Sequence, residues 1–128
     1  MDNKEIQIIY KNDHFVAINK PSGLLVHPSP HTNPSEITLA DIMVKKFPEI
    51  SKVGDKPDIR PGIVHRLDRY TSGIMIMART QKFFDYFKDL LKTRNIKKTY
   101  WALVWGEVKE EGVIDTPIGL ISGSTKRS

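Results

Sequence analysis

The stretch His65-Arg66-Leu67-Asp68-Arg69-Tyr70-Thr71-Ser72-Gly73, followed at once by Ile74-Met75-Ile76-Met77-Ala78, says most about how this chain folds. Residues 74–78, which follow the motif, show little alternation between apolar and polar side chains. The same holds for residues 63–67, which overlap the start of the motif. Such runs are typical of strands that are buried on both faces. The stretch therefore predicts two strands, at residues 63–67 and 74–78, that flank a Thr-Ser-Gly turn.

One carboxylate, that of Asp68, lies between the guanidinium groups of Arg66 and Arg69. If residues 66 to 68 are extended, Arg66 and Asp68 share one face, and His65 lies on the other face in a structural role. Neighbouring positive charges favour an ionised carboxylate, and such a group can act as a nucleophile toward carbon. The alternative is a purely structural Arg–Asp pair at a strand end.

The bulk composition describes one ordinary domain with a basic surface. The chain has 128 residues and 20 Lys and Arg against 15 Asp and Glu, a net charge of +5 that suits a polyanionic partner without proving one. Cysteine is absent, which excludes disulfides, thiol nucleophiles and Cys-ligated zinc. The N-terminus shows no signal-like apolar core, and no apolar run approaches the roughly 20 residues of a membrane span, so we expect a cytoplasmic protein without a membrane partner.

The remaining sequence predicts a hairpin and two helices. Residues 6–10 and 15–18 read as strands joined by a turn at 11–14, and residues 20–34 read as loop. Thr38 begins a helix that ends at Pro48, after which residues 49–61 read as a mobile connection. The apolar side chains expected to be buried by this helix are Leu39, Ile42, Met43 and Phe47.

A second helix starts at Thr80 and carries apolar residues at helical spacing. These residues are Phe83, Phe84, Phe87, Leu90 and Leu91. Residues 100–105 are aromatic and β-branched and predict a further strand. The fold class is therefore α+β, a mixed and mainly antiparallel central sheet flanked by helices and loops.

The motif at residues 65–73 resembles the catalytic motif of the RluA-type pseudouridine synthases, which isomerise uridine in ribosomal and transfer RNA. Three other blocks resemble that family in the same order, at residues 19–28, 98–106 and 114–119. Together the four blocks cover the chain from about Ile6 to Lys126. Four ordered motifs make a specific signal, although each alone would be weak.

The resemblance implies roles for individual residues. Asp68 would start cleavage of the uridine N-glycosidic bond, either as a nucleophile or as a base, and the uracil would rejoin the ribose through C5. Arg66 would fill the space that the flipped base leaves, unless it simply pairs with Asp68. Tyr100 would stack on the base or handle a proton, unless it is a core aromatic. Arg69 is the other local cation that could hold Asp68 ionised, and it would bind RNA.

Further basic residues are candidate RNA contacts. Lys98 would contact backbone phosphates, and Lys20 and His27 lie in a loop that the family places near its cleft. The implied partner is rRNA or tRNA, with no cofactor, because the reaction is an isomerisation. We expect no metal, because prolines separate His27 from His31 and prevent the helix that would align them.

Two departures from the family pattern affect what the chain can do. Tyr70 stands where the family often has a small or acidic residue, and no counterpart of the family's last, arginine-bearing motif is found. We therefore expect residues 1–128 to be a single, incomplete catalytic domain that is inactive alone and self-associates through exposed apolar surface. The rival interpretations are a non-catalytic RNA-binding module and a structural fragment without an RNA role. A kinase-like and a glycosidase interpretation fail for want of the accompanying motifs.

Overall fold

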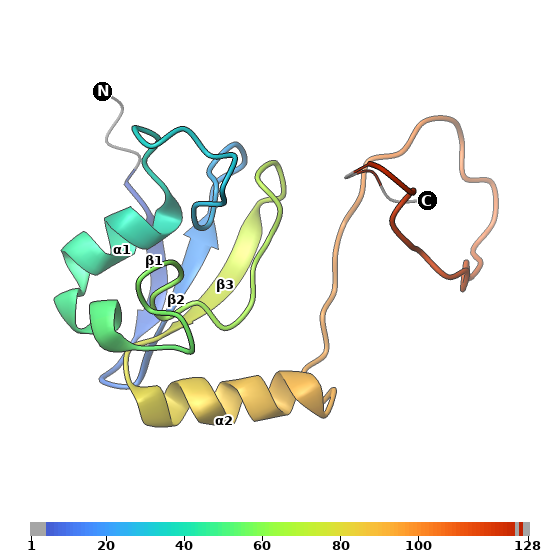
Figure 1. Cartoon of the computed structure of the whole chain (residues 1–128). Helices are drawn as coiled ribbons and strands as arrows, with labels where there is room; N and C mark the ends of the chain where they lie inside the picture. Colours follow the sequence, from blue (N-terminus) through green and yellow to red (C-terminus); the bar gives the residue numbers. More distant parts are fainter. Residues whose placement is uncertain (1–4, 125, 127–128) are drawn as a thin grey trace. The chain divides into compact units, whose positions relative to one another are not determined.

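The structure, a computed structural model, describes residues 5–124 and Lys126 and divides the chain into two units (Figure 1). The first unit is Met1–Lys97 and contains the helices and strands described below. The second unit is Lys98–Ser128. Each is described by itself.

A three-stranded antiparallel sheet forms the centre of the first unit, in the order β1-β2-β3 (Figure 1). Its strands are β1 (Gln7–Lys11), β2 (Phe15–Lys20) and β3 (Gly73–Ala78). The predicted hairpin is confirmed, and Asn12 closes its turn by accepting hydrogen bonds from the backbone N–H groups of His14 (2.8 Å) and Phe15 (2.9 Å). The strand predicted at residues 74–78 is also confirmed, as β3.

One face of this sheet is covered by helix α1 (Leu39–Lys46) and the 3-10 helix η1 (Pro48–Lys52) (Figure 1). Val16 pairs with Met77 and Ile18 with Met75, so these four side chains share that face, and all are fully buried. Burying an apolar side chain of this size stabilises a fold by about 1.5–3 kcal/mol. This layer is the main hydrophobic core.

Helix α1 begins where the sequence predicts. The Thr38 hydroxyl accepts from the backbone N–H of Asp41, and the Asp41 carboxylate accepts from the backbone N–H of Thr38 (2.8 Å), a complete capping box. Of the apolar residues assigned to this helix, Leu39, Met43 and Phe47 are buried and Ile42 is half-buried.

The segment predicted as a mobile connection is instead anchored to the core. It begins with η1 and buries Ile50 (0% exposed) and Val53 (5% exposed). Most residues of this segment are polar, so its composition does not indicate that Ile50 and Val53 are buried.

Helix α2 (Gln81–Lys92) starts at the predicted cap, because the Thr80 hydroxyl accepts from the backbone N–H of Phe83 (3.2 Å). Phe84 is buried, and the ring of Phe83 stacks on Phe15 of β2 at a centroid distance of 4.7 Å. The other apolar residues of the predicted stripe, Phe87, Leu90 and Leu91, are half-buried.

Two predicted strands are absent from the described residues. Residues 63–67 make only an isolated bridge, between Ile63 and Met77, because the side chain of His65 replaces a backbone group: its Nε2 accepts from the backbone N–H of Ile76 (3.0 Å). Residues 100–105 form no strand in the part of the chain that the structure describes, and Trp101 and Trp105 are fully exposed.

The predicted α+β class is confirmed, although the sheet of the described residues is wholly antiparallel rather than mixed. Among these same residues, no helix is long and apolar enough to cross a bilayer.

Candidate active site

Asp68 presents its carboxylate to solvent at the end of an anchored segment. Leu67 is buried in the main core (7% exposed), whereas Arg66 and Asp68 on either side of it are exposed. This is the alternation that the sequence predicts. Immediately after Asp68 the chain turns, and the backbone N–H of Thr71 donates to the Asp68 carbonyl (3.1 Å).

Residues 20–23 hold the backbone of this turn from one side. The carbonyl of Arg69 accepts from the backbone N–H of Gly23 (2.8 Å) and from Nζ of Lys20 (2.9 Å). The carbonyl of Tyr70 accepts from the hydroxyl of Ser22 (2.8 Å). Residues 19–28 and 65–73, which are far apart in the sequence, therefore meet at the candidate site.

The burial of Lys20 contradicts the prediction that it contacts RNA. This residue is 0% exposed, and besides the Arg69 carbonyl its Nζ donates to the carbonyls of Pro21 (2.9 Å) and Leu24 (2.8 Å). Its position at the end of β2, pointing to the core side with Ile18, explains the burial. Lys20 therefore acts as a clamp: the three hydrogen bonds from its Nζ hold the backbone of the turn at Arg69 to residues 21–24.

Arg66 contacts His27, so the structure brings together two of the predicted RNA-binding residues. The Nδ1 of His27 lies 2.9 Å from the carbonyl of Pro28, so Nδ1 carries the proton and donates. The Nε2 atom then accepts from Nη1 of Arg66, at 3.4 Å. This bond is long for a hydrogen bond, and the guanidinium of Arg66 is exposed.

Arg69 pairs with Glu36 rather than with Asp68. Its Nη1 and Nη2 donate to the two carboxylate oxygens of Glu36, the second at 3.4 Å. The hydrogen bond from Arg69 holds the pKa of Glu36 below its ordinary value, and the same bond raises the pKa of Arg69. Among the described residues Asp68 forms no ion pair, so the prediction that Arg66 or Arg69 pairs with it is wrong here.

Sequence reasoning does not identify Glu36 or Ser22 as site residues. One signal could have pointed to Glu36: it is the sole carboxylate between Asp13 and Asp41. The carboxylate of an isolated acidic residue in a loop can form two parallel hydrogen bonds with the guanidinium of an arginine.

Tyr100 and Lys98 belong to the second unit, where both are exposed. Tyr100 has 61% of its surface exposed, which contradicts the core-aromatic alternative within the described residues. Their predicted roles beside Asp68 stay predictions.

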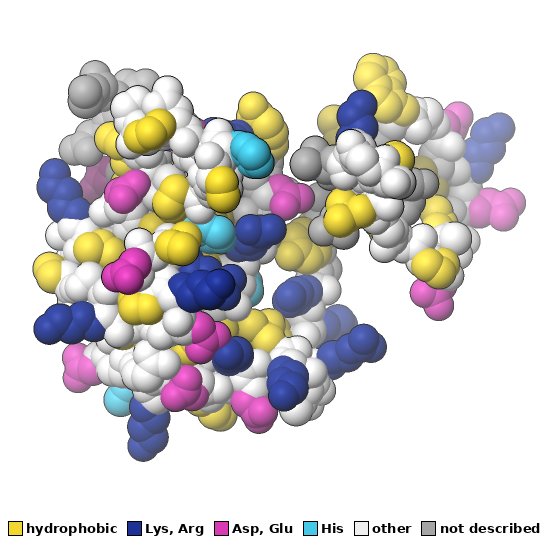
Figure 2. All heavy atoms as spheres, in the orientation of Figure 1, with side chains coloured by type: hydrophobic (Ala, Val, Ile, Leu, Met, Phe, Trp, Pro, Cys, Tyr) yellow, Lys and Arg dark blue, Asp and Glu magenta, His cyan; other side chains and the backbone are white. Residues whose placement is uncertain are grey.

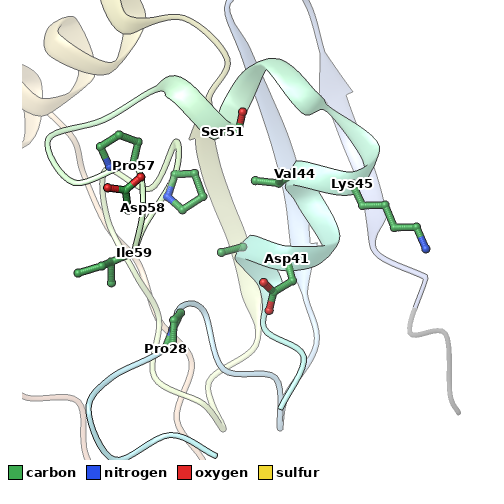
Figure 3. A pocket seen from close by; sticks show the side chains of 10 residues that line it. Pro28, Asp41, Val44, Lys45, Ser51, Pro57, Asp58 and Ile59 are labelled. Carbon is green, nitrogen blue, oxygen red and sulfur yellow. The ribbon is translucent and has the colours of Figure 1, made fainter. Parts of the chain in front are cut away.

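One face of the surface and one pocket can be compared with the candidate site. On the face of the first unit seen in Figure 2, Lys and Arg are interspersed with Asp and Glu. A pocket of about 470 Å³ lies between α1 and residues 57–61, and Asp68 does not line it (Figure 3). Its Asp41 is committed to the α1 cap, and in Figure 3 the side chain of Lys45 points away from it. The described residues contain no group of three or more His, Cys, Asp or Glu placed to hold a metal ion.

Comparison with known proteins shows the family of this chain. The sequence profile of the RNA pseudouridylate synthases matches residues 14–127. The chain belongs to the RNA pseudouridylate synthase family. It is 38% identical to ribosomal large subunit pseudouridine synthase D of Nitrosomonas europaea over 89% of this chain and 31% of that protein. It is 42% identical to an uncharacterized RNA pseudouridine synthase of Chloroflexus aurantiacus over 79% of this chain and 30% of that protein.

A solved structure supports the same family. The human protein "RNA Pseudouridylate Synthase Domain Containing 4" matches 70% of this chain and 30% of its own, with a TM-score of 0.50 and 26% identity. The resemblance to RluA-type synthases is thereby confirmed. The chain spans about a third of the length of the curated relatives that it matches.

Proposed function

We propose that this chain supplies the aspartate-bearing part of an RNA pseudouridine synthase, which isomerises a flipped-out uridine to pseudouridine. The observation that carries the proposal is the placement of Asp68: an exposed carboxylate on a hydrogen-bonded turn, within the residues that the family profile matches. A carboxylate on a rigid turn is the arrangement that positions a reacting group with little entropic cost.

The proposed reaction breaks one bond and forms another without a redox change. The N1–C1′ glycosidic bond breaks with help from the Asp68 carboxylate, acting as nucleophile or as base. The uracil turns and forms a C5–C1′ bond. C5 then loses its proton to solvent and N1 holds one, so the product is an isomer of the substrate.

Arg66 is proposed to occupy the place of the flipped uridine in the RNA stack. Extruding a base costs a few kcal/mol, and a planar guanidinium can stack on neighbouring bases while donating hydrogen bonds. Arg66 is exposed close to Asp68 in the sequence, and its Nη1 makes a long hydrogen bond of 3.4 Å to His27. His27 is therefore proposed to hold the side chain of Arg66 by this hydrogen bond until RNA binds.

Roles are also proposed for two residues of the second unit. Tyr100 would stack on the extruded base and Lys98 would bind a phosphate. We propose rRNA or tRNA as the substrate and the cytoplasm as the location. Five of the similar proteins carry a name that specifies the ribosomal large subunit, which favours rRNA.

We also propose that residues 1–128 form a single catalytic domain that needs a further segment. One support is that the chain covers only 31% of the length of the relative from Nitrosomonas europaea. The other is the full exposure of the apolar side chains of Trp101, Leu103 and Trp105. Exposed apolar residues in a β-type pattern favour pairing with another strand. The purified 128-residue chain should then show little activity and a tendency to self-associate.

Tritium release tests the proposed reaction. Protein expressed from the complete gene is incubated with [5-³H]uridine-labelled total RNA from cells that lack the gene, and release of tritium reports loss of the C5 proton. Asp68→Asn should abolish release and retain RNA binding. Asp89→Asn, at an exposed position on α2, serves as the matched control and should leave release unchanged.

The rival function is a non-catalytic RNA-binding module. It is worth testing because Asp68 forms no ion pair within the described residues. A module predicts salt-dependent RNA binding without tritium release by any variant. That result from the wild-type protein would rule out the enzyme.

A further inference from the structure

The pair between Glu36 and Arg69 connects the turn of the candidate site to the loop that precedes α1. Glu36 lies two residues before Thr38, the cap of α1, and Arg69 directly follows Asp68. Both side chains are partly enclosed, with 30% of Glu36 and 35% of Arg69 exposed. A contact across 33 positions of the sequence holds two segments together rather than stabilising one locally.

The geometry of this pair restricts the orientation of Arg69. Each terminal nitrogen of the guanidinium donates to a different carboxylate oxygen of Glu36. Two parallel bonds of this kind fix the plane of both groups, which one bond would not do. The pKa of Glu36 is lowered chiefly by the hydrogen bond from Arg69, so the pair stays charged at neutral pH.

The backbone of Arg69 is held independently, by Lys20 and Gly23, which both donate to its carbonyl. Ser22 holds the next carbonyl, that of Tyr70. Residues 20–23 thus restrain the turn through its backbone, and Glu36 restrains it through the Arg69 side chain. Loss of Glu36 would leave the first restraint and therefore the fold in place.

We propose that Glu36 is a positioning residue, which orients the turn that presents Asp68 by binding the guanidinium of Arg69. The inference rests on the proposed function, since it is the carboxylate of Asp68 that must meet the ribose. A shift of about 1 Å at a reacting group can cost up to roughly a hundredfold in rate. Arg69 accordingly serves the turn through its pair with Glu36.

The experiment compares three variants of the protein expressed from the complete gene: Glu36→Gln, Arg69→Glu and the exchange Glu36→Arg with Arg69→Glu. Asp55→Asn is the matched control, because Asp55 pairs with Lys88 across the same sequence separation, with no residue of the turn involved. Steady-state tritium release gives kcat and KM. Amide hydrogen exchange at Thr71, whose N–H donates to the Asp68 carbonyl, gives a readout that needs no activity.

The expected result is a kcat about tenfold lower for Glu36→Gln, with KM changed less than twofold and faster exchange at Thr71. The exchanged pair should restore most of the loss, and Asp55→Asn should match wild type. A loss confined to KM that the exchanged pair does not rescue would show that Arg69 binds RNA directly and would overturn the proposal. Wild-type kcat in Glu36→Gln would also overturn it. If wild type releases no tritium, the proposed function fails, and unchanged exchange at Thr71 would then separately overturn the positioning role.

Discussion

Replacing Lys20 by methionine tests the clamp beneath the turn. Methionine keeps most of the apolar stem of lysine and removes the ammonium group, so packing changes little while hydrogen bonds disappear. In the structure Lys20 is 0% exposed, and its Nζ donates to the carbonyls of Pro21, Leu24 and Arg69. The change therefore isolates the contribution of one buried charge.

The magnitude follows from how deeply each of the three carbonyls is buried. Arg69 keeps the hydrogen bond from the backbone N–H of Gly23, and the carbonyl of Pro21 is only partly buried. The bond to the Leu24 carbonyl is buried, and an unsatisfied buried acceptor costs about 1–3 kcal/mol. The other two charged bonds add to this loss, while removal of a buried ammonium recovers several kcal/mol of desolvation. We expect Lys20→Met to lower the free energy of unfolding by about 2–4 kcal/mol.

Urea unfolding followed by circular dichroism measures this change. A loss of 2 kcal/mol in a unit of this size lowers Tm by at least about 8 °C. Lys11→Met is the control, because Lys11 is exposed on β1, and it should change stability by no more than about 0.5 kcal/mol. Equal stability of Lys20→Met and wild type would refute the reasoning, since it would mean that the three carbonyls gain nothing net from the ammonium.

Three further predictions concern the core, the RNA contact and pH. Gly62→Ala should cost about 2–4 kcal/mol in urea unfolding, because φ is +66° and a Cβ would lie 2.6 Å from the Ala78 carbonyl oxygen, whereas Gly112→Ala, with open space around it, should be neutral. Arg66→Lys keeps the charge and loses the stacking plane, so tritium release should fall roughly tenfold while the salt dependence of RNA binding stays unchanged; equal release would contradict the stacking role. The lowered pKa of Glu36 means that its pair contributes above the ordinary value of 4.5 and is lost as pH falls through the lowered pKa, so urea midpoints of wild type and Glu36→Gln should differ at neutral pH and converge in acid.

The elements that the sequence predicts well are those with local signals. The capping residues Thr38 and Thr80 mark both helix starts, because a cap needs only the following turn. The hairpin follows from two short apolar runs and a polar turn. Asp68 was found because it lies in a dense motif of residue types that serve chemistry.

Side-chain contacts over long sequence distances escaped prediction. Nothing in the sequence indicates that His65 would take over a hydrogen bond of β3, which ends the expected strand at Ile63. The prediction that Lys20 contacts RNA comes from its place in a loop that the resemblance puts near the cleft, and the structure buries Lys20 against three carbonyls. The prediction that Arg69 holds Asp68 rests on their proximity in the sequence, and the fold pairs Arg69 with Glu36 instead.

The central claim is that the exposed carboxylate of Asp68 isomerises uridine in RNA. Position-resolved mapping of pseudouridine in rRNA and tRNA, in cells with the gene, without it and with Asp68→Asn in its place, tests this claim most directly. We predict one or more pseudouridines that vanish on deletion, return with the wild-type gene and stay absent with Asp68→Asn. Full restoration by Asp68→Asn would contradict the account.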